Sequence, residues 1–173
     1  MTAMRPQPQL LPSAVDILRC VREVSHDLLA PSLTGHAERS AAATIDHMLR
    51  YVERLLDHQG QALLEEEEKL KALLPKAADW LAGRDAALAE AIHADCAVAR
   101  DSTIYPTLAM MEDRVALLRQ HVCDTLTALH AEGAAKGADG EALHDMLRDY
   151  IRWQIAREGE LVEPAFLGHG PRR

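Results

Sequence analysis

The apolar residues of this chain are almost all aliphatic. They make up 48% of its 173 residues, whereas aromatic residues account for 3% and the chain has a single Phe. Such a core favours closely packed helices, because β-sandwiches are rich in short alternating runs of Val, Ile, Tyr and Phe. Apolar residues also recur at helical spacing along most of the chain. The sequence therefore predicts an all-α fold, a mostly antiparallel bundle of five to six helices.

We expect one helical domain over residues 13–158, between an irregular N-terminus at 1–12 and an irregular tail at 159–173. Ser13 and Asp16 resemble a capping box, which predicts a helix start at this point. The helices themselves are expected at about 14–30, 36–59, 61–74, 84–100, 104–132 and 140–158, with a short helical turn after Pro75 and a loop of three glycines at 133–140.

The breaks between the expected helices come from single residues. Gly60 and Pro75 are each expected to end a helix, because Gly favours the position after a helix and Pro cannot continue one. The acidic block Glu65–Glu68 is expected on a solvated helix surface, where Lys69 and Lys71 follow it at i,i+3 and i,i+4.

The charge of the chain excludes several classes of partner. A net charge of −8 leaves no basic stripe for nucleic acid or for an anionic membrane surface. No stretch approaches the roughly 20 apolar residues that a membrane span needs. Cys20, Cys96 and Cys123 are far apart and form no CxxC motif, which indicates reduced thiols. We therefore expect a cytoplasmic protein that binds neither nucleic acid nor membrane.

Three histidines lie eleven residues apart on the helix expected at 36–59, namely His36, His47 and His58. At about 100° per residue they fall within about 40° of one another and share one face. Successive histidines are separated by about 16 Å along the axis, whereas the ligands of one Zn²⁺ each lie about 2.1 Å from it. The three histidines therefore cannot share one metal ion.

A second face of the same helix is apolar, and we expect it to be buried in the domain core. It consists of Ala37, Ala41, Ile45, Met48, Leu49, Val52, Leu55 and Leu56. On the histidine face, small side chains leave room for a second helix to approach. We therefore predict a partner-binding strip made of His36, Arg39, Ser40, Ala43, His47 and Arg54. A polar, solvated helix face that binds nothing is the alternative interpretation.

Residues suited to catalysis do not converge in the expected fold. The motifs Glu90–His93 and Glu141–His144 resemble halves of the di-iron site of four-helix bundles, but the expected helices place them near opposite ends of the bundle. We predict no catalytic residue, no cofactor and no metal site. If a metal is present, the expected ligands are Glu90, His93 and Glu112, which lie on either side of the break DSTIYP.

Several short motifs carry a resemblance to a known family. They are Arg5-Pro6, Val21-Arg22-Glu23, the segment from Leu28 to Gly35, and His36 with Arg39. In this region the chain resembles small helical bacterial proteins that are similar to accessory subunits encoded beside aminoglycoside-phosphotransferase-like kinases. The resemblance implies a partner kinase that acts on hydroxyacyl-CoA substrates and needs the small subunit for activity.

Together these observations favour a non-catalytic accessory or interaction protein, the partner subunit of a phosphotransferase-like kinase that acts on acyl-CoA substrates. Its expected partner is another protein or a second copy of the chain. The alternative from a different class is a small helical enzyme or ligand-binding protein whose pocket lies between helices and, in one form, depends on a metal.

Overall fold

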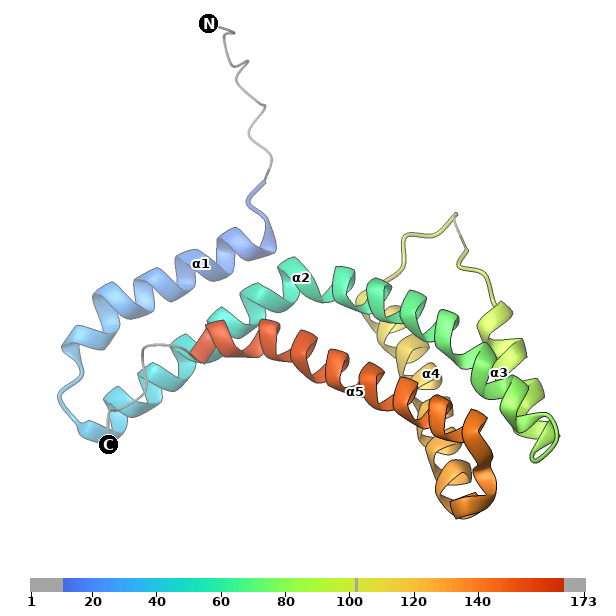
Figure 1. Cartoon of the computed structure of the whole chain (residues 1–173). Helices are drawn as coiled ribbons and strands as arrows, with labels where there is room; N and C mark the ends of the chain where they lie inside the picture. The colour runs from blue at the N-terminus through green and yellow to red at the C-terminus, as the bar shows by residue number, and fades with distance from the viewer. Residues whose placement is uncertain (1–10, 102, 167–173) are drawn as a thin grey trace, which may run out of the picture. The chain divides into compact units, whose positions relative to one another are not determined.

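A computed structural model describes residues 11–101 and 103–166. It is 87% helical, with five α-helices and no strand in the described residues, which confirms the predicted all-α fold. The helices are α1 (Ala14–Val24), α2 (His36–Leu81), α3 (Ala86–Ala97), α4 (Leu108–Glu132) and α5 (Gly137–Phe166) (Figure 1).

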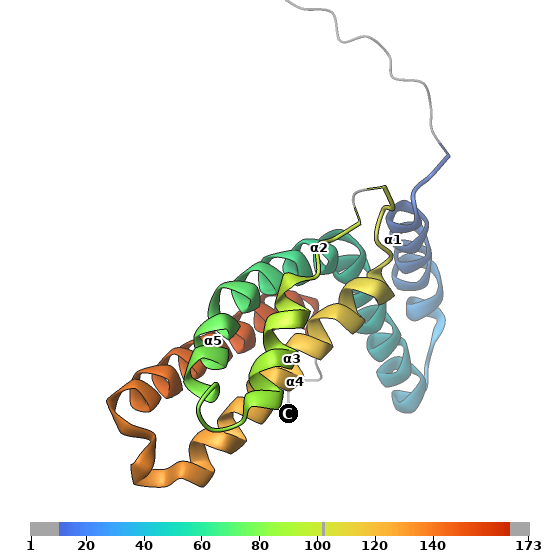
Figure 2. The same ribbon diagram turned by 90° about the vertical axis from the view of Figure 1, so that its right-hand side faces the viewer.

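The chain is grouped into two compact units, whereas the sequence predicts one domain over 13–158. Unit 1 consists of the residues up to Asp57 and those from Leu161 onward. Unit 2 is His58–Glu160. Unit 1 contains α1 and the first part of α2, which lie side by side (Figure 1). Unit 2 contains the rest of α2, α3, α4 and most of α5, and in it α3 lies beside α4 (Figure 2).

Local capping chemistry sets most of the helix starts. The capping box of α1 is present, because Ser13 Oγ accepts from the Asp16 amide and the Asp16 carboxylate accepts from the Ser13 amide, both at 3.1 Å. After Val24 the helix widens into a π-helical turn at Ser25–Leu29. Thr107 caps α4, so this helix begins at Leu108 and the expected start near residue 104 is wrong.

The predicted helix ends at Gly60 and Pro75 are wrong, because α2 continues through both residues to Leu81. An interior Gly costs about 1 kcal/mol and an interior Pro about 3 kcal/mol in helix stability. Beside Pro75, Leu74 and Ala77 are fully buried in unit 2. Burial of each large aliphatic side chain contributes about 1.5–3 kcal/mol, so tertiary packing outweighs the local preference to break.

The predicted tail is also partly wrong, because α5 continues from residue 158 to Phe166. The remainder of the predicted tail, residues 167–173, lies outside the described residues. So does nearly all of the N-terminus predicted to be irregular, residues 1–10.

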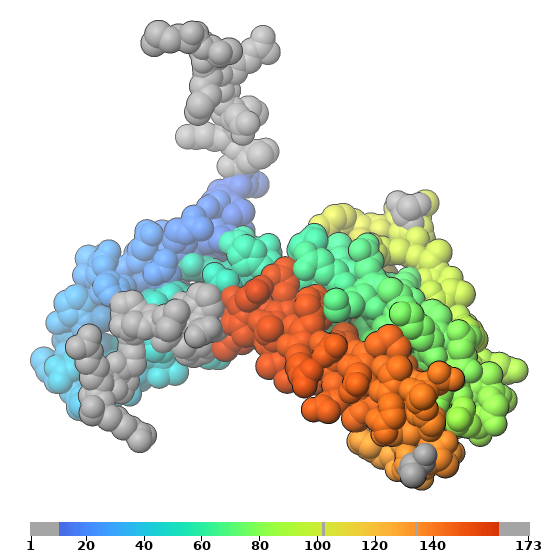
Figure 3. All heavy atoms as spheres, viewed as in Figure 1, coloured from blue at the N-terminus to red at the C-terminus, as the bar shows by residue number. Residues whose placement is uncertain are grey.

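Unit 2 holds the buried core. Its largest fully buried apolar side chains are Leu70, Leu74, Leu81, Ile92, Val115, Leu118, Leu129, Leu143 and Leu147. Within this unit, α5 packs along the second part of α2 (Figure 3). Lys69 lies over the Trp153 ring, 4.9 Å from its centroid, and Arg157 pairs with Glu65 at 3.0 Å. The core is aliphatic, as the composition indicates.

The three glycines of the expected loop have different roles. Gly133 and Gly137 adopt positive φ angles of 53° and 67°, which Gly reaches without steric cost. Gly140 lies inside α5, where an added Cβ would be 2.7 Å from Lys136 Cβ and 3.0 Å from Trp80 Nε1. The loop is therefore a tight connection, and Gly140 allows α5 to pack closely on Trp80.

We expect Gly140→Ala to lower the free energy of unfolding by about 1–3 kcal/mol, because the new methyl group overlaps Lys136 and the indole. Gly159→Ala is the matched control. It lies in the same helix with open space around its Cβ position, so this change should stabilise the protein by about 0.5–1 kcal/mol. Urea denaturation of both variants measures the difference, and equal effects would contradict the packing role of Gly140.

Candidate functional site

The residues of the predicted partner-binding strip all lie on α2, but their surroundings differ. His36 and Ser40 are exposed near the start of α2, and the Ser40 carbonyl accepts from Thr44 Oγ1. His47 is half-buried. Arg54 donates from Nε to the Leu161 carbonyl at 3.1 Å, so part of the strip contacts α5 within unit 1.

Arg39 and Ala43, the other two strip residues, line a cavity of about 220 Å³ in unit 1. The cavity lies between α2 and the π-helical turn that follows α1. Its remaining lining residues are Ser25, His26, Ala30, Ala42 and Asp46. On this side of α2, Ala42 and Ala43 face the segment that follows α1, whose Ser25, His26 and Ala30 line the same cavity.

Asp46 is the only buried residue among the described residues of unit 1, with 7% of its surface exposed. One of its carboxylate oxygens accepts from Arg50, while Oδ1 has no hydrogen-bond partner in the described structure. A ligand N–H or O–H in this cavity could satisfy it. Sequence reasoning missed Asp46, because acidic residues are rarely buried and Arg50 at i+4 indicates only a surface pair.

The apolar face of unit 1 is exposed, so the prediction that this side of α2 is buried is wrong. We define this face by eight large aliphatic residues that are 37–68% exposed. They are Ile17, Val21, Val24 and Leu28 from α1 and the π-helical turn, and Ile45, Met48, Val52 and Leu56 from α2. No apolar side chain is buried among the described residues of unit 1.

Both helices turn their exposed aliphatic residues to the same side of the hairpin. Arg22 Nε donates to Glu53 Oε1 at 3.0 Å and marks where α1 and α2 meet. At about 100° per residue, the exposed residues lie on average about 130° back from Arg22 on α1 and about 95° back from Glu53 on α2. Because the helices are antiparallel, rotations of the same sign bring the two rows of exposed residues to one side. The eight residues therefore form one surface.

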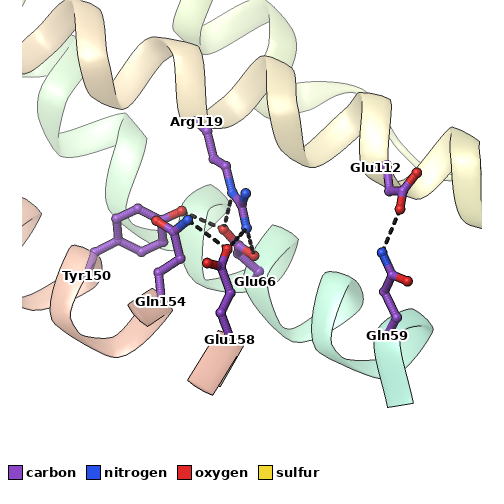
Figure 4. A network of polar contacts seen from close by, with 7 residues as sticks. All are labelled: Gln59, Glu66, Glu112, Arg119, Tyr150, Gln154 and Glu158. Atoms are coloured by element: carbon purple, nitrogen blue, oxygen red, sulfur yellow. Dashed lines mark hydrogen bonds and ion pairs between the residues drawn. The ribbon is translucent and has the colours of Figure 1, made fainter. Parts of the chain in front are cut away.

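In unit 2, Glu66 forms a buried network with α4 and α5 (Figure 4). Its carboxylate accepts two hydrogen bonds from Arg119, at 2.6 and 2.8 Å, and one from the Tyr150 hydroxyl at 2.6 Å. Arg119 also contacts Glu158 at 3.0 Å. Burial, together with the bond to Glu66, raises the pKa of Tyr150, and the bond to Glu66 raises that of Arg119. Both groups therefore keep their protons.

The neighbouring Glu67 is also buried and is contacted by three cations. Lys71 and Arg100 lie 2.8 and 2.7 Å from its oxygens, and Arg114 lies at 3.5 Å. Burial by itself raises the pKa of Glu67, but hydrogen bonds from Lys71 and Arg100 outweigh it, so the pKa lies below its usual value. The expectation of a solvated acidic block is therefore wrong for Glu66 and Glu67, although the predicted Glu67–Lys71 pair is present.

The alternative metal ligands are not placed as one set. Glu112 accepts from Gln59 Nε2 at 2.5 Å, and His93 lies 3.9 Å from Asp79. The described part of the chain contains no group of three His, Cys, Asp or Glu residues that could hold a metal ion.

The register of α3 on α4 explains this separation. Asp95 contacts Arg114 through its carbonyl and His121 Nε2 through its carboxylate, the latter at 2.7 Å. In an antiparallel pair, residues before Asp95 then lie beside later residues of α4. Glu90 and His93 are therefore displaced along the helix from Glu112.

Unit 2 also has a larger cavity, of about 600 Å³, where the end of α2 meets the start of α5. Lys76, Arg84 and Lys136 line it, together with Asp79 and Asp139. Arg84 stacks on the Trp80 ring at 4.2 Å from its centroid, and the Trp80 indole donates to the Lys136 carbonyl at 3.3 Å. Three cations and an indole are groups that could contact an anionic ligand.

Comparison of the chain with protein-family models, with curated proteins and with solved structures gave no match. Within the described residues, none of the helices has the length and apolarity needed to cross a membrane.

We expect Glu66→Ala to lower the free energy of unfolding by about 3–5 kcal/mol, because it leaves a buried Arg119 charge and a buried Tyr150 hydroxyl without their acceptor. Glu112→Ala is the matched control. Glu112 is exposed, so its loss should cost no more than about 0.5 kcal/mol. Chemical denaturation compares the two variants, and similar losses would contradict the structural role of the Glu66 network.

The lowered pKa of Glu67 predicts a pH-dependent contribution to stability. A carboxyl whose pKa is lower in the folded state stabilises the protein above its unfolded pKa, and this contribution is lost as the pH falls through the folded value. The stability difference between the wild type and Glu67→Gln should therefore be larger at pH 7 than at pH 3. Exposed Glu68→Gln is the control, whose difference should stay nearly constant. Denaturation at the two pH values tests this, and a constant difference for Glu67→Gln would refute it.

Proposed function

We propose that this chain is a non-catalytic interaction protein that works by assembling with other polypeptides. The observation that supports it is the apolar face of unit 1, in which eight aliphatic side chains are 37–68% exposed on one surface. Monomeric proteins rarely expose contiguous apolar patches larger than a few hundred Å², and larger patches mark interaction sites. A face of this kind gains stability when another protein removes it from water.

The acidic side chains in the interior of unit 2 also support a non-catalytic role, because they are engaged in holding its helices together. Glu66 and Glu67 are held by hydrogen bonds from arginine, lysine and tyrosine side chains. Asp95 is held by His121. Glu66 and Glu67 are buried and Asp95 is half-buried, and each of the three joins helices to one another.

The sequence resemblance supplies the candidate partner. It implies a phosphotransferase-like kinase that acts on acyl-CoA substrates, for which this chain would be the accessory subunit. In that role the chain would stabilise or position the kinase, and the kinase would carry all the catalytic groups.

A ligand-binding protein with an interhelical pocket is the second candidate function. The cavity of about 600 Å³ at the start of α5 favours it, because Lys76, Arg84 and Lys136 line that cavity beside Trp80. Elemental analysis of the purified protein separates the metal-dependent form of this candidate from the accessory role. Stoichiometric iron, zinc or manganese would favour the second candidate.

Co-expression of this chain with the products of the genes beside its own tests the accessory role, which predicts a phosphotransferase-like kinase among them. We expect the two chains to elute together in size-exclusion chromatography, and the kinase to lose most of its acyl-CoA phosphorylation activity when this chain is omitted. An unrelated helical protein of similar size, co-expressed in the same way, is the control. A kinase that is fully active alone, together with separate elution of the two chains, would refute the proposed function.

A further inference from the structure

We propose that a second copy of the chain covers the apolar face of unit 1, so that two α1–α2 hairpins form a four-helix bundle. This inference rests on the proposed function in one respect, because both take the apolar face as an assembly surface. It goes further by naming the occupant of that face. With the face covered by a second copy, the kinase would bind the dimer through another surface, and its role as partner then rests on the sequence resemblance.

The spacing of the exposed residues is the first argument for a helical occupant. On the first helical segment, Ile17, Val21, Val24 and Leu28 follow one another at intervals of four, three and four residues. On α2, Ile45, Met48, Val52 and Leu56 follow at intervals of three, four and four residues. Intervals of three and four residues keep side chains on one helix face, as in helices that pack side chains into one another along their length. The surface is therefore suited to antiparallel or parallel helices rather than to a loop or a sheet edge.

The second argument is the arrangement of the two rows of exposed aliphatic residues, one on each helix of the α1–α2 hairpin. It points to a copy of the same hairpin. A four-helix bundle needs four apolar rows that converge on one core. One hairpin supplies two such rows on the same side, and a twofold axis supplies the other two. With the axis parallel to the helices, each α1 lies beside the partner's α2 and runs antiparallel to it. The same eight residues then serve both sides of the interface.

The area of the face is the third argument. Eight side chains that are about half exposed present on the order of 600 Å² of apolar surface. Each partner in a standard interface contributes about 800 Å², of which roughly 60% is apolar. The face is therefore large enough for a stable dimer without a contribution from unit 2. Unit 1 also has no buried apolar side chain among its described residues, so dimer formation would give it the core that it lacks alone.

Light scattering of the full chain without any kinase, over a range of concentrations, tests this inference. We expect a mass of twice 19.1 kDa. Met48→Glu places a charge in the middle part of the face and should raise the dimer dissociation constant by about 30-fold or more, as for a central interface residue. Because Met48 is exposed, the variant should keep its helical content, which circular dichroism verifies.

Ile155→Glu is the matched control, because Ile155 is 64% exposed on α5 in unit 2. This variant should dimerise as the wild type does. A monomer at every concentration, or equal weakening by the two substitutions, would overturn the inference. A monomer that still co-elutes with the kinase would refute the dimer and leave the proposed function intact. A dimer that fails to bind the kinase would refute the proposed function alone.

Discussion

Two adjacent buried carboxylates, Glu66 and Glu67, hold unit 2 together. They point to different neighbours from one turn of α2: Glu66 binds Arg119 of α4 and Tyr150 of α5, and Glu67 binds Arg100 and Arg114. Leaving either carboxylate buried without its partners would cost several kcal/mol. These directional contacts, together with the close-packed aliphatic core, fix how the helices are aligned.

The two units differ in how far their apolar side chains are buried. Unit 2 buries its leucines against one another and also buries the acidic groups that align its helices. Unit 1 has helices of the same aliphatic type, yet its apolar face is exposed and the residue it buries is Asp46. The difference follows from the number of helices. A four-helix arrangement can surround a core, whereas a two-helix hairpin can cover only one side of each helix.

The sequence predicts the existence and type of the elements better than their ends. Helical periodicity and the Ser13–Asp16 capping box correctly indicate the first helix, because both depend on neighbours within a few residues. Gly60 and Pro75 wrongly indicate helix ends, because the free energy that favours a break there is smaller than the free energy gained by burying the residues around them. For the candidate site, Ala42 and Ala43 line a cavity together with Ser25, His26 and Ala30 of the same chain. No pattern in the sequence connects these two segments.

The sequence by itself determines the all-α class, the positions of the amphipathic segments and the heptad rows on α1 and α2, because these depend on residue type and on spacing along one helix. Only the tertiary structure decides which faces are covered. The partners of Glu66 and Glu67 include residues 33 to 84 positions away, and no local pattern connects them. The same holds for the apolar face of unit 1: its residues are evident in the sequence, but their exposure depends on which side of α2 the first helix packs.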